Sequence, residues 1–272
     1  MAKDKLAPGD IVDLGDGVVA TQEENYGAAL SLESSGEPNV PKAIVAYPGA
    51  RAVIGSTDLE FGLRVPNTSD TWANDWVLAG LTLRGFVQAA DIGGSGSSRW
   101  RIIGNDISCP MGDGQTGCFA AALASHIFFL GNKVHDISAG ASQQPSKQYH
   151  AVYFTTDTNH IEVGWNDIRN NRTCRAIQFH SSPLCTPDCG SSDTTGFNQY
   201  DLSVHDNWIR EILVTASTSP PLIQPRDQSV PITISSSTAV LALIPLMETP
   251  LCLYLCGRGT ITGTMARESC GL

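Results

Sequence analysis

One short pattern, which reads apolar, any, apolar, any, any, Asn, any, apolar, occurs five times in this sequence. The Asn place holds Leu81 in the first copy and an asparagine in the other four. Aligned on this place, three apolar columns run through the copies: Trp76, Trp100, Ile127, Ile161 and Leu202; Leu78, Ile102, Phe129, Val163 and Val204; and Leu83, Ile107, Val134, Ile168 and Ile209. Three columns that hold across five copies predict that the same strand, corner and strand are stacked repeatedly, as in a solenoid.

The spacing and alternation of the copies indicate which solenoid this is. Successive Asn places lie 24, 27, 34 and 41 residues apart, and each copy alternates with period two, which is the period of a strand and not of a helix. Leucine-rich repeats also carry an Asn, but their Leu scaffold and helical return segment are not visible here. The sequence therefore predicts an all-β, right-handed, single-stranded parallel β-helix. The growing interval predicts long loop insertions, where functional residues usually lie.

The four asparagines have a structural explanation. A corner between strands leaves backbone groups without ladder partners, and Asn both tolerates the left-handed conformation and bonds to nearby backbone through its amide. Stacked one coil apart, Asn105, Asn132, Asn166 and Asn207 are expected to bond to one another as an internal ladder. Their spacing follows the repeat, so we interpret them as scaffold and not as catalytic residues.

The residues from about 6 to 210 resemble the right-handed parallel β-helix proteins of the pectate-lyase-like superfamily. The resemblance rests on an opening coil with Pro8, Gly9 and Asp10, a second-coil phrase from Ala43 to Ala50, and the Asn-bearing coils that follow. Families of this type include polysaccharide lyases, glycoside hydrolases and epimerases, along with non-catalytic adhesins and phage tail fibres. The resemblance thus implies the fold strongly and the chemistry weakly.

Composition favours a single elongated domain of a secreted type. The chain has 272 residues, of which 42% are hydrophobic and 16% charged, enough for one continuous core. The net charge of −10 argues against a nucleic-acid partner, because phosphate binding needs a basic face. No apolar run approaches the length that spans a bilayer.

Eight cysteines indicate an oxidising compartment. Cys109 and Cys118 bracket one inserted loop, while Cys174, Cys185 and Cys189 cluster in another, so we expect disulfides on long loops. Zinc is the alternative, but no second close cysteine or histidine pair stands at finger spacing. We expect a secreted, periplasmic or cell-surface protein, although no signal peptide is visible at the start of the chain.

The two ends of the chain depart from the repeat. It begins almost inside the turn around Pro8, so we expect that an N-terminal part of the first coil is missing. After about Glu211 the repeat stops in mid-coil, and the residues become rich in Ser, Thr and Pro. We divide the chain into a β-helix domain, 1–211, and an atypical tail, 212–272. The tail is interpreted as a cap, a disordered segment or the product of a frameshift.

Two segments pair well in register and indicate a polar face. They are 150–157 and 175–182, in which Val152 and Phe154 lie over Ile177 and Phe179 as inward residues. The outward side chains of the two segments then stand side by side, next to a coil whose outward residues are Ala120 and Ala122. A small-residue floor beside a polar wall predicts a groove.

The residues of this wall are suited to proton chemistry. Cleavage of a uronic-acid polymer by β-elimination needs a base, a cation that neutralises the carboxylate, and an acid for the leaving oxygen. We expect His180 or Lys147 as base, Arg175 as neutralising cation and Tyr153 as acid. Hydrolysis needs two carboxylates instead; Asp157 is one, with Asp188 and Asp193 as the nearest partners. The candidate catalytic residues are therefore His180, Arg175, Tyr153, His150, Asp157 and Lys147, and the candidate substrate-binding residues are Gln178, Thr155, Trp165 and Trp208.

Several readings stay open. His126 and His160 occupy the same place in adjacent coils, where a turn-capping role outweighs metal binding. No cofactor is indicated with certainty; Ca²⁺ is possible, because an acidic protein that binds an acidic polymer needs a basic groove or a bridging cation. The expected partner is a polysaccharide or glycan. The alternative to a lyase is a non-catalytic glycan-binding or adhesin β-helix, or a glycoside hydrolase on the same fold. The oligomeric state is not indicated.

Overall fold

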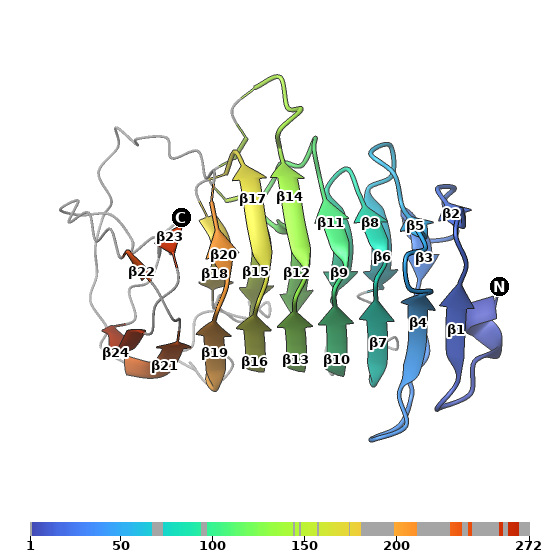
Figure 1. The fold of residues 1–272 in the computed structure, drawn as a ribbon, viewed down its shortest axis with the longest axis horizontal. Coiled ribbons are helices and arrows are strands. Elements are labelled where there is room, and N and C mark those ends of the chain that lie inside the picture. The colour runs from blue at the N-terminus through green and yellow to red at the C-terminus, as the bar shows by residue number, and fades with distance from the viewer. Residues whose placement is uncertain are drawn as a thin grey trace, which may run out of the picture.

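Almost every strand of the computed structural model belongs to one of three sheets that run the length of the molecule (Figure 1). The structure describes residues 2–66, 73–93, 97–143, 145–146, 148–156, 158–173, 175–180 and 199–210, together with the backbone of four strands after residue 228. Among these residues the one helical element is a short 3₁₀ turn, η1 (Ala2–Lys5). Nothing in this part of the chain forms a helix long and apolar enough to cross a membrane.

Each of the first six coils contributes one strand to each sheet, in the order A, B, C, and the described part of the seventh contributes to A and B. Sheet A contains β1 (Ile11–Leu14), β4 (Lys42–Ala46), β7 (Trp76–Ala79), β10 (Ser98–Ile103), β13 (Ser125–Leu130), β16 (Asn159–Gly164) and β19 (Leu202–His205). Sheet B contains β2 (Val19–Ala20), β5 (Val53–Ile54), β8 (Thr82–Arg84), β11 (Asp106–Ser108), β14 (Lys133–Ile137), β17 (Asp167–Asn171) and β20 (Trp208–Ile209). Sheet C contains β3 (Ala28–Ser31), β6 (Phe61–Val65), β9 (Gln88–Ile92), β12 (Gly117–Ala122), β15 (His150–Thr155) and β18 (Arg175–His180).

The path of the chain is that of a right-handed parallel β-helix. All strand pairs named above are parallel, and each strand pairs with its equivalent in the next coil. In Figure 1 the chain rises along sheets A and B on the near side, returns along sheet C on the far side, and advances from right to left. This sense of advance is right-handed, as predicted from the sequence.

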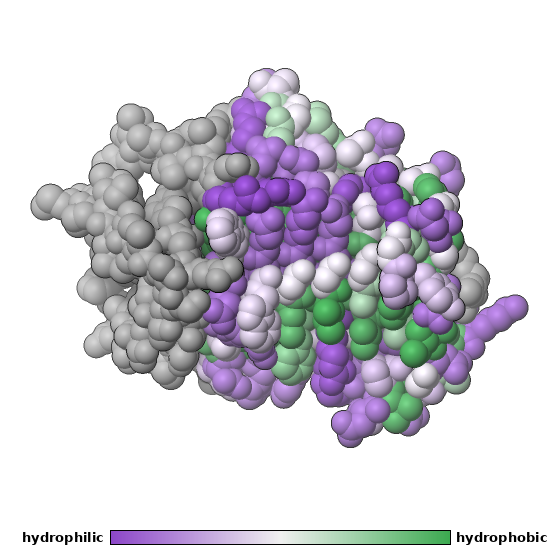
Figure 2. Space-filling model, in the orientation of Figure 1, coloured by the Kyte–Doolittle hydropathy of each residue, from purple (hydrophilic) through white to green (hydrophobic). Residues whose placement is uncertain are grey.

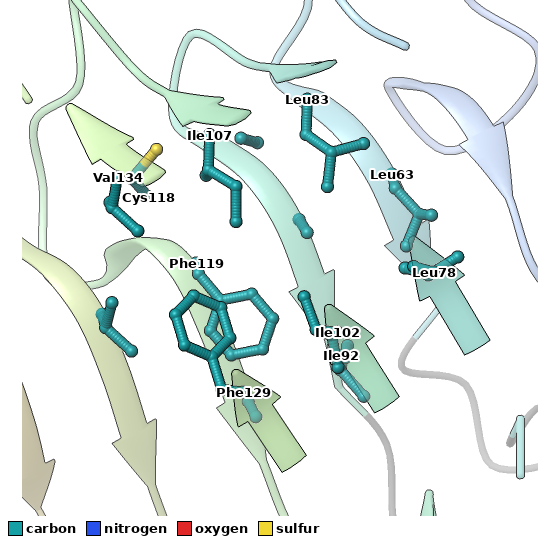
Figure 3. Close-up of a cluster of buried hydrophobic side chains, with 14 of the residues drawn as sticks. Leu63, Leu78, Leu83, Ile92, Ile102, Ile107, Cys118, Phe119, Phe129 and Val134 are labelled. Carbon is teal, nitrogen blue, oxygen red and sulfur yellow. The ribbon is translucent and has the colours of Figure 1, made fainter. Parts of the chain in front are cut away.

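The three predicted apolar columns form the interior. Trp76, Trp100 and Ile127 are direct register partners in sheet A, and the second and third columns pair in the same way. Almost all members of the columns are fully buried, and the side chains from successive coils lie over one another (Figure 3). Sheet C completes this interior, with the Phe119 ring centroid 4.6 Å from that of Phe129. The burial of apolar side chains is therefore continuous along the axis.

The asparagine column forms the predicted ladder between sheets A and B. The Oδ1 atom of Asn132 accepts bonds from the backbone N and the Nδ2 of Asn105, at 3.0 and 3.1 Å. Asn166 receives the same two bonds from Asn132, and Asn207 receives them from Asn166. Each Nδ2 also donates to a backbone carbonyl of the preceding coil; for Asn132 this is Ile102 O, at 2.9 Å. The buried corner thus has its polar groups satisfied without water.

One predicted disulfide is present. Cys109 and Cys118 are joined, with their Cα atoms 5.6 Å apart, and they close the loop between β11 and β12. The prediction of a disulfide on this insertion is confirmed. Cys174, Cys185 and Cys189 lie outside the described residues.

The last described strands continue beyond the Asn repeat. β21 (Ser229–Ser235) pairs in parallel with β19, and β24 (Ile261–Ala266) pairs antiparallel with β21. A two-residue pair, β22 (Ala239–Val240) and β23 (Cys256–Gly257), is also antiparallel. The change from parallel to antiparallel pairing begins after the boundary predicted at 211. The division into two parts, and the interpretation of the tail, stay predictions.

The outer surfaces of the sheets differ in polarity. In Figure 2, a polar band covers the strands of sheet B, and an apolar band covers the middle of sheet A. Ile103, the last residue of β10 in sheet A, is an apolar side chain that is 39% exposed. Sheet C lies on the far side of this view. Its outer face carries most of the residues predicted to act in chemistry.

Candidate functional site

The candidate site lies on the outer face of sheet C, where equivalent residues of successive coils form rows. One row consists of register partners: Ser31, Arg64, Asp91, Ala120, Tyr153 and Gln178. The next row places Ala122, Thr155 and His180 side by side. The inward partners are those predicted, with Val152 on Ile177 and Phe154 on Phe179. Because side chains alternate across a strand, the polar members of both rows face outward together.

Tyr153 and His180 are in direct contact within this face. The Tyr153 hydroxyl lies 3.2 Å from His180 Nδ1, and the two rings are stacked. Burial, with a further contribution from the nearby positive charge of Arg175, lowers the pKa of His180 below its ordinary value of 6.5. The imidazole is therefore neutral at neutral pH, the state in which a histidine accepts a proton.

His150 lies beneath this pair and is nearly inaccessible. It is 2% exposed, its ring centroid is 4.8 Å from that of Tyr153, and its backbone pairs with Arg175. Burial lowers the pKa of His150 to about 3, and the charges of Arg175 and His180 act in the same direction. Its buried Nδ1 has no hydrogen-bond partner. His150 is thus a neutral, buried imidazole that packs against Tyr153.

A second polar pair on the same face was not predicted from the sequence. Arg64 Nε lies 3.4 Å from a carboxylate oxygen of Asp91, and the guanidinium stacks 4.0 Å from the Phe61 ring centroid. Burial raises the pKa of Asp91 to about 6, although the charge of Arg64 and a hydrogen bond from Gln88 oppose this shift. The signal in the sequence was the outward parity of 64 and 91. Neither residue belongs to a column that repeats through the coils, so the pattern did not predict their pairing.

The floor between the two polar pairs is small. Ala120 separates Asp91 from Tyr153 in the row, and Ala122 precedes Thr155 in the next. At about 4.8 Å per strand, roughly 10 Å separate the backbones that carry Asp91 and Tyr153. The predicted combination of a small-residue floor and a polar wall is present, and the structure adds a second polar wall on the N-terminal side.

The remaining candidates are spread over other parts of the molecule. Lys147 and Asp157, together with Asp188 and Asp193, lie outside the described residues. Trp165 stands at the corner between β16 and β17, and Trp208 belongs to β20. Both are exposed, at 58% and 52%, as predicted. Neither lies on sheet C, so the structure does not bring them to the other candidates.

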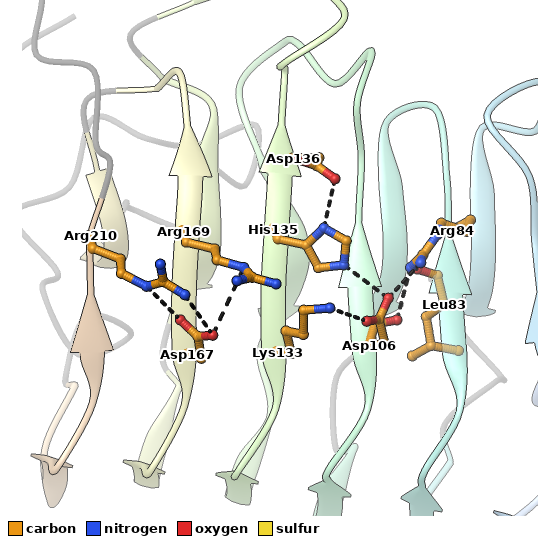
Figure 4. A network of polar contacts seen from close by, with 9 residues as sticks. All are labelled: Leu83, Arg84, Asp106, Lys133, His135, Asp136, Asp167, Arg169 and Arg210. Atoms are coloured by element: carbon orange, nitrogen blue, oxygen red, sulfur yellow. Dashed lines mark hydrogen bonds and ion pairs between the residues drawn. The ribbon is translucent and has the colours of Figure 1, made fainter. Parts of the chain in front are cut away.

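The outer face of sheet B carries a dense charged network (Figure 4). Asp106 contacts Arg84, Lys133 and His135, the last two at 3.1 and 3.0 Å. Burial alone would raise the pKa of Asp106, yet hydrogen bonds from His135 and Arg84 hold it well below its ordinary value. Asp167 forms ion pairs with Arg169 and with Arg210. Since these charges satisfy one another, the network is a stabilising element of sheet B.

The described residues do not fit a metal site. No group of three or more His, Cys, Asp or Glu side chains in this part of the chain is arranged to hold an ion. Asp91 is engaged by Arg64, and the stacked rings of His126 and His160 occupy left-handed corner positions, with centroids 4.4 Å apart. The described residues therefore offer no set of ligands for Ca²⁺, and the reaction proposed for this face involves no metal.

Comparisons with known proteins found similar solved structures. No protein-family model and no curated protein matches the sequence. An alginate lyase from Paenibacillus sp. str. FPU-7 is similar in structure, with 16% identity over 78% of this chain and 71% of that one and a TM-score of 0.43. The pectate lyase Pel9A is similar with 10% identity over 79% and 72%, and a TM-score of 0.33. The strand pairing of the chain itself establishes the architecture: it is a parallel β-helix, the fold that the pectate-lyase-like resemblance implied.

Proposed function

We propose that this chain is a secreted, carbohydrate-active protein that cleaves an acidic polysaccharide by β-elimination on the outer face of sheet C. The observation that carries the proposal is the contact between the Tyr153 hydroxyl and His180 Nδ1, which lie 3.2 Å apart. Arg175 begins the strand that ends at His180, and its positive charge contributes to the lowered pKa of that histidine. A phenol, a neutral imidazole and a guanidinium together supply the acid, the base and the cation that this reaction needs.

The proposed roles of the two rings correspond to the His180 tautomer that carries its proton on Nδ1. When the Nδ1–H of His180 donates to the Tyr153 oxygen, Nε2 is left as the acceptor that removes the proton from the carbon next to the substrate carboxylate. The released electron pair forms the carbon–carbon double bond, and the glycosidic oxygen leaves with the Tyr153 hydroxyl proton. Transfer of the Nδ1 proton to the phenolate then restores Tyr153. His180, whose Nε2 has gained the substrate proton, returns to its neutral form.

Arg175 neutralises the substrate carboxylate as negative charge develops next to it, and Gln178 and Thr155 flank the reacting groups as hydrogen-bonding side chains. Lys147 remains the alternative base, and Asp157 an additional group of the same wall. His150 acts as a positioning residue, because its neutral ring packs against Tyr153 and its pKa of about 3 excludes a cationic role at neutral pH.

The test is the appearance of ultraviolet absorbance from unsaturated uronic products when the full chain acts on alginate, pectin or glycosaminoglycans. We expect Tyr153→Phe and His180→Ala each to reduce kcat by about 10²-fold or more. Arg175→Lys should retain more activity than Arg175→Ala. Arg101→Ala, on the outer face of sheet A, is the matched control and should leave the rate unchanged. Wild-type rates in Tyr153→Phe and His180→Ala would remove both residues from the mechanism.

Hydrolysis is the second candidate, and Asp91 is the observation that favours it. A carboxyl group with a pKa of about 6 is a suitable general acid near neutral pH. In that case new reducing ends would form without ultraviolet absorbance, and Asp91→Asn would abolish their formation. If neither product appears on any polymer but binding does, the chain is a non-catalytic glycan-binding β-helix.

The expected location follows from the disulfide. The Cys109–Cys118 bond closes an inserted loop, and disulfides of this kind persist in oxidising compartments. We therefore infer that the protein acts outside the cytoplasm, where polysaccharides of this class occur.

A further inference from the structure

Trp165 occupies a backbone position that other coils fill with glycine. The residue before the Asn place is Gly80, Gly104, Gly131, Trp165 and Asp206 in successive coils, and all five have a positive φ. The φ of Trp165 is 56°. Glycine adopts this left-handed conformation freely and aspartate tolerates it, whereas a bulky side chain adopts it at a cost. Tyr26, Leu123 and Thr156 also have a positive φ, so this conformation alone does not mark a functional site.

Burial does not offset the strain at Trp165. The residue is 58% exposed. A Cβ atom added at Gly104 or Gly131 would have no atom within 4 Å, so side chains in this column project into open space. More than half of the Trp165 residue surface is therefore left open to a ligand.

Trp165 packs against a histidine that is itself anchored. Its ring stands edge-on to the imidazole of His205, with centroids 4.5 Å apart and an interplanar angle of 84°. His205 is fixed in turn by Glu162 Oε1 at 3.1 Å and by Asp206 Oδ2 at 3.2 Å. The imidazole lies so close to Gly164 that an added Cβ would be 2.5 Å from its Cε1 atom. The indole thus projects from a preformed base.

We propose that Trp165, Glu162 and Asp206 form a binding site for a neutral pyranose sugar. The flat indole offers an apolar surface to the C–H face of a sugar ring. Glu162 and Asp206 each bond to His205 through one oxygen, and their second oxygens accept hydroxyl protons. Two carboxylates at one site repel a uronate, so this site should prefer a neutral sugar. The site on sheet C, by contrast, is proposed to bind an acidic one.

The site is independent of the proposed cleavage reaction. Trp165 lies at the corner between sheets A and B, whereas Tyr153 and His180 belong to sheet C. A protein with both sites would attach to a neutral glycan while it acts on an acidic one. The binding measurement below needs no catalytic activity, so its outcome and that of the cleavage assay are separable.

The experiment measures the binding of the full chain to neutral oligosaccharides of glucose, mannose, galactose and xylose, with oligouronates for comparison, by calorimetry and affinity gel electrophoresis. We expect at least one neutral series to bind, and Trp165→Gly to weaken that binding at least tenfold. The melting temperature of Trp165→Gly should equal or exceed that of the wild type, because glycine relieves the strain. Trp165→Ala should lose binding equally, and Tyr47→Ala, another aromatic residue that is 58% exposed, should keep it.

Glu162→Gln and Asp206→Asn test the charge argument, since each keeps an acceptor oxygen but removes a negative charge. Together they should admit oligouronates that the wild type rejects. The proposal is overturned if no neutral sugar binds, if Trp165→Gly binds as well as the wild type, or if Trp165→Gly melts at a lower temperature. The last result would show that the indole serves the fold.

Discussion

The asparagine ladder allows a quantitative prediction for Asn132→Ala. The Asn132 side chain makes four hydrogen bonds, two through Oδ1 to Asn105 and two through Nδ2, to Ile102 O and to Asn166 Oδ1. The substitution removes all four. The backbone N–H and one amide N–H of Asn105, which is 1% exposed, are then left without this acceptor.

The expected loss of stability follows from these orphaned donors. Each buried, unsatisfied group costs about 1–3 kcal/mol, so two of them predict a decrease of roughly 2–6 kcal/mol in the free energy of unfolding. Asn132→Leu distinguishes the loss of hydrogen bonds from the loss of packing. Its larger side chain fills the space but still leaves both donors of Asn105 without an acceptor. We therefore expect Asn132→Leu to be destabilised as well. Leu81 stands in the same column without this penalty, because it is the first member and its backbone N donates to Asn105 Oδ1.

Equilibrium urea unfolding measures the effect, with the fluorescence of the buried Trp76 and Trp100 and circular dichroism as two probes. Coincident transitions are needed, because solenoids can unfold in parts. Ser203→Ala, an outward substitution on β19, is the matched control and should change stability by less than about 0.5 kcal/mol. A loss for Asn132→Ala no larger than that of the control would refute the reasoning, since it would mean that water or backbone movement replaces the ladder.

Three further predictions concern stability. Asp91 has a folded pKa raised from 3.8 to about 6, so its ionised form destabilises the fold. The free energy of unfolding of Asp91→Asn should equal that of the wild type below pH 4 and exceed it by about 2–3 kcal/mol above pH 6. Urea unfolding at a series of pH values measures this, and a difference that does not change with pH would contradict it. Asp106 has a lowered pKa, so the stability it contributes is present at neutral pH and lost as the pH falls below 3.8; Asp106→Asn should flatten the acid limb of the melting curve. Cys118→Ser should cost about 2–3 kcal/mol, and reductant should lower the melting temperature of the wild type more than that of the variant.

One prediction concerns the pH dependence of activity. Burial lowers the pKa of His180, and the neutral imidazole is the base, so kcat/KM should rise with pH along an acid limb whose midpoint lies below pH 6.5. Measurement of the initial rate of absorbance increase between pH 4 and 8 checks this. An acid limb centred above 6.5 would point to a different base.

The sequence predicted the interior better than the outer faces. The columns through Ile102 and Phe129, the ladder of asparagines and the parallel register were predictable because every coil repeats them, and each copy supports the others. The pairing of 150–155 with 175–180 was predictable for the same reason, since its inward residues had to match.

The outer faces follow no repeat, and this is where prediction failed or stayed incomplete. Arg64 and Asp91 each occur once, so no column drew attention to their pairing. The burial of His150 depends on what surrounds the first residue of β15, which alternation alone does not determine. The strain at Trp165 was predictable in principle, because glycine precedes the Asn place in three of the five copies; that column was not examined for backbone conformation.

Because the coils are stacked, the position of a side chain does not depend on how many residues separate it from its partner in the next coil. Equivalent residues of neighbouring coils are register partners whether 24 or 41 residues intervene, because the surplus leaves the stack as a loop. Loops of different size and chemistry are therefore exchangeable around sheet C while Tyr153 and Gln178 keep their mutual distance. Grafting a foreign loop between β14 and β15 should change which polymer is accepted and leave the reacting groups in place.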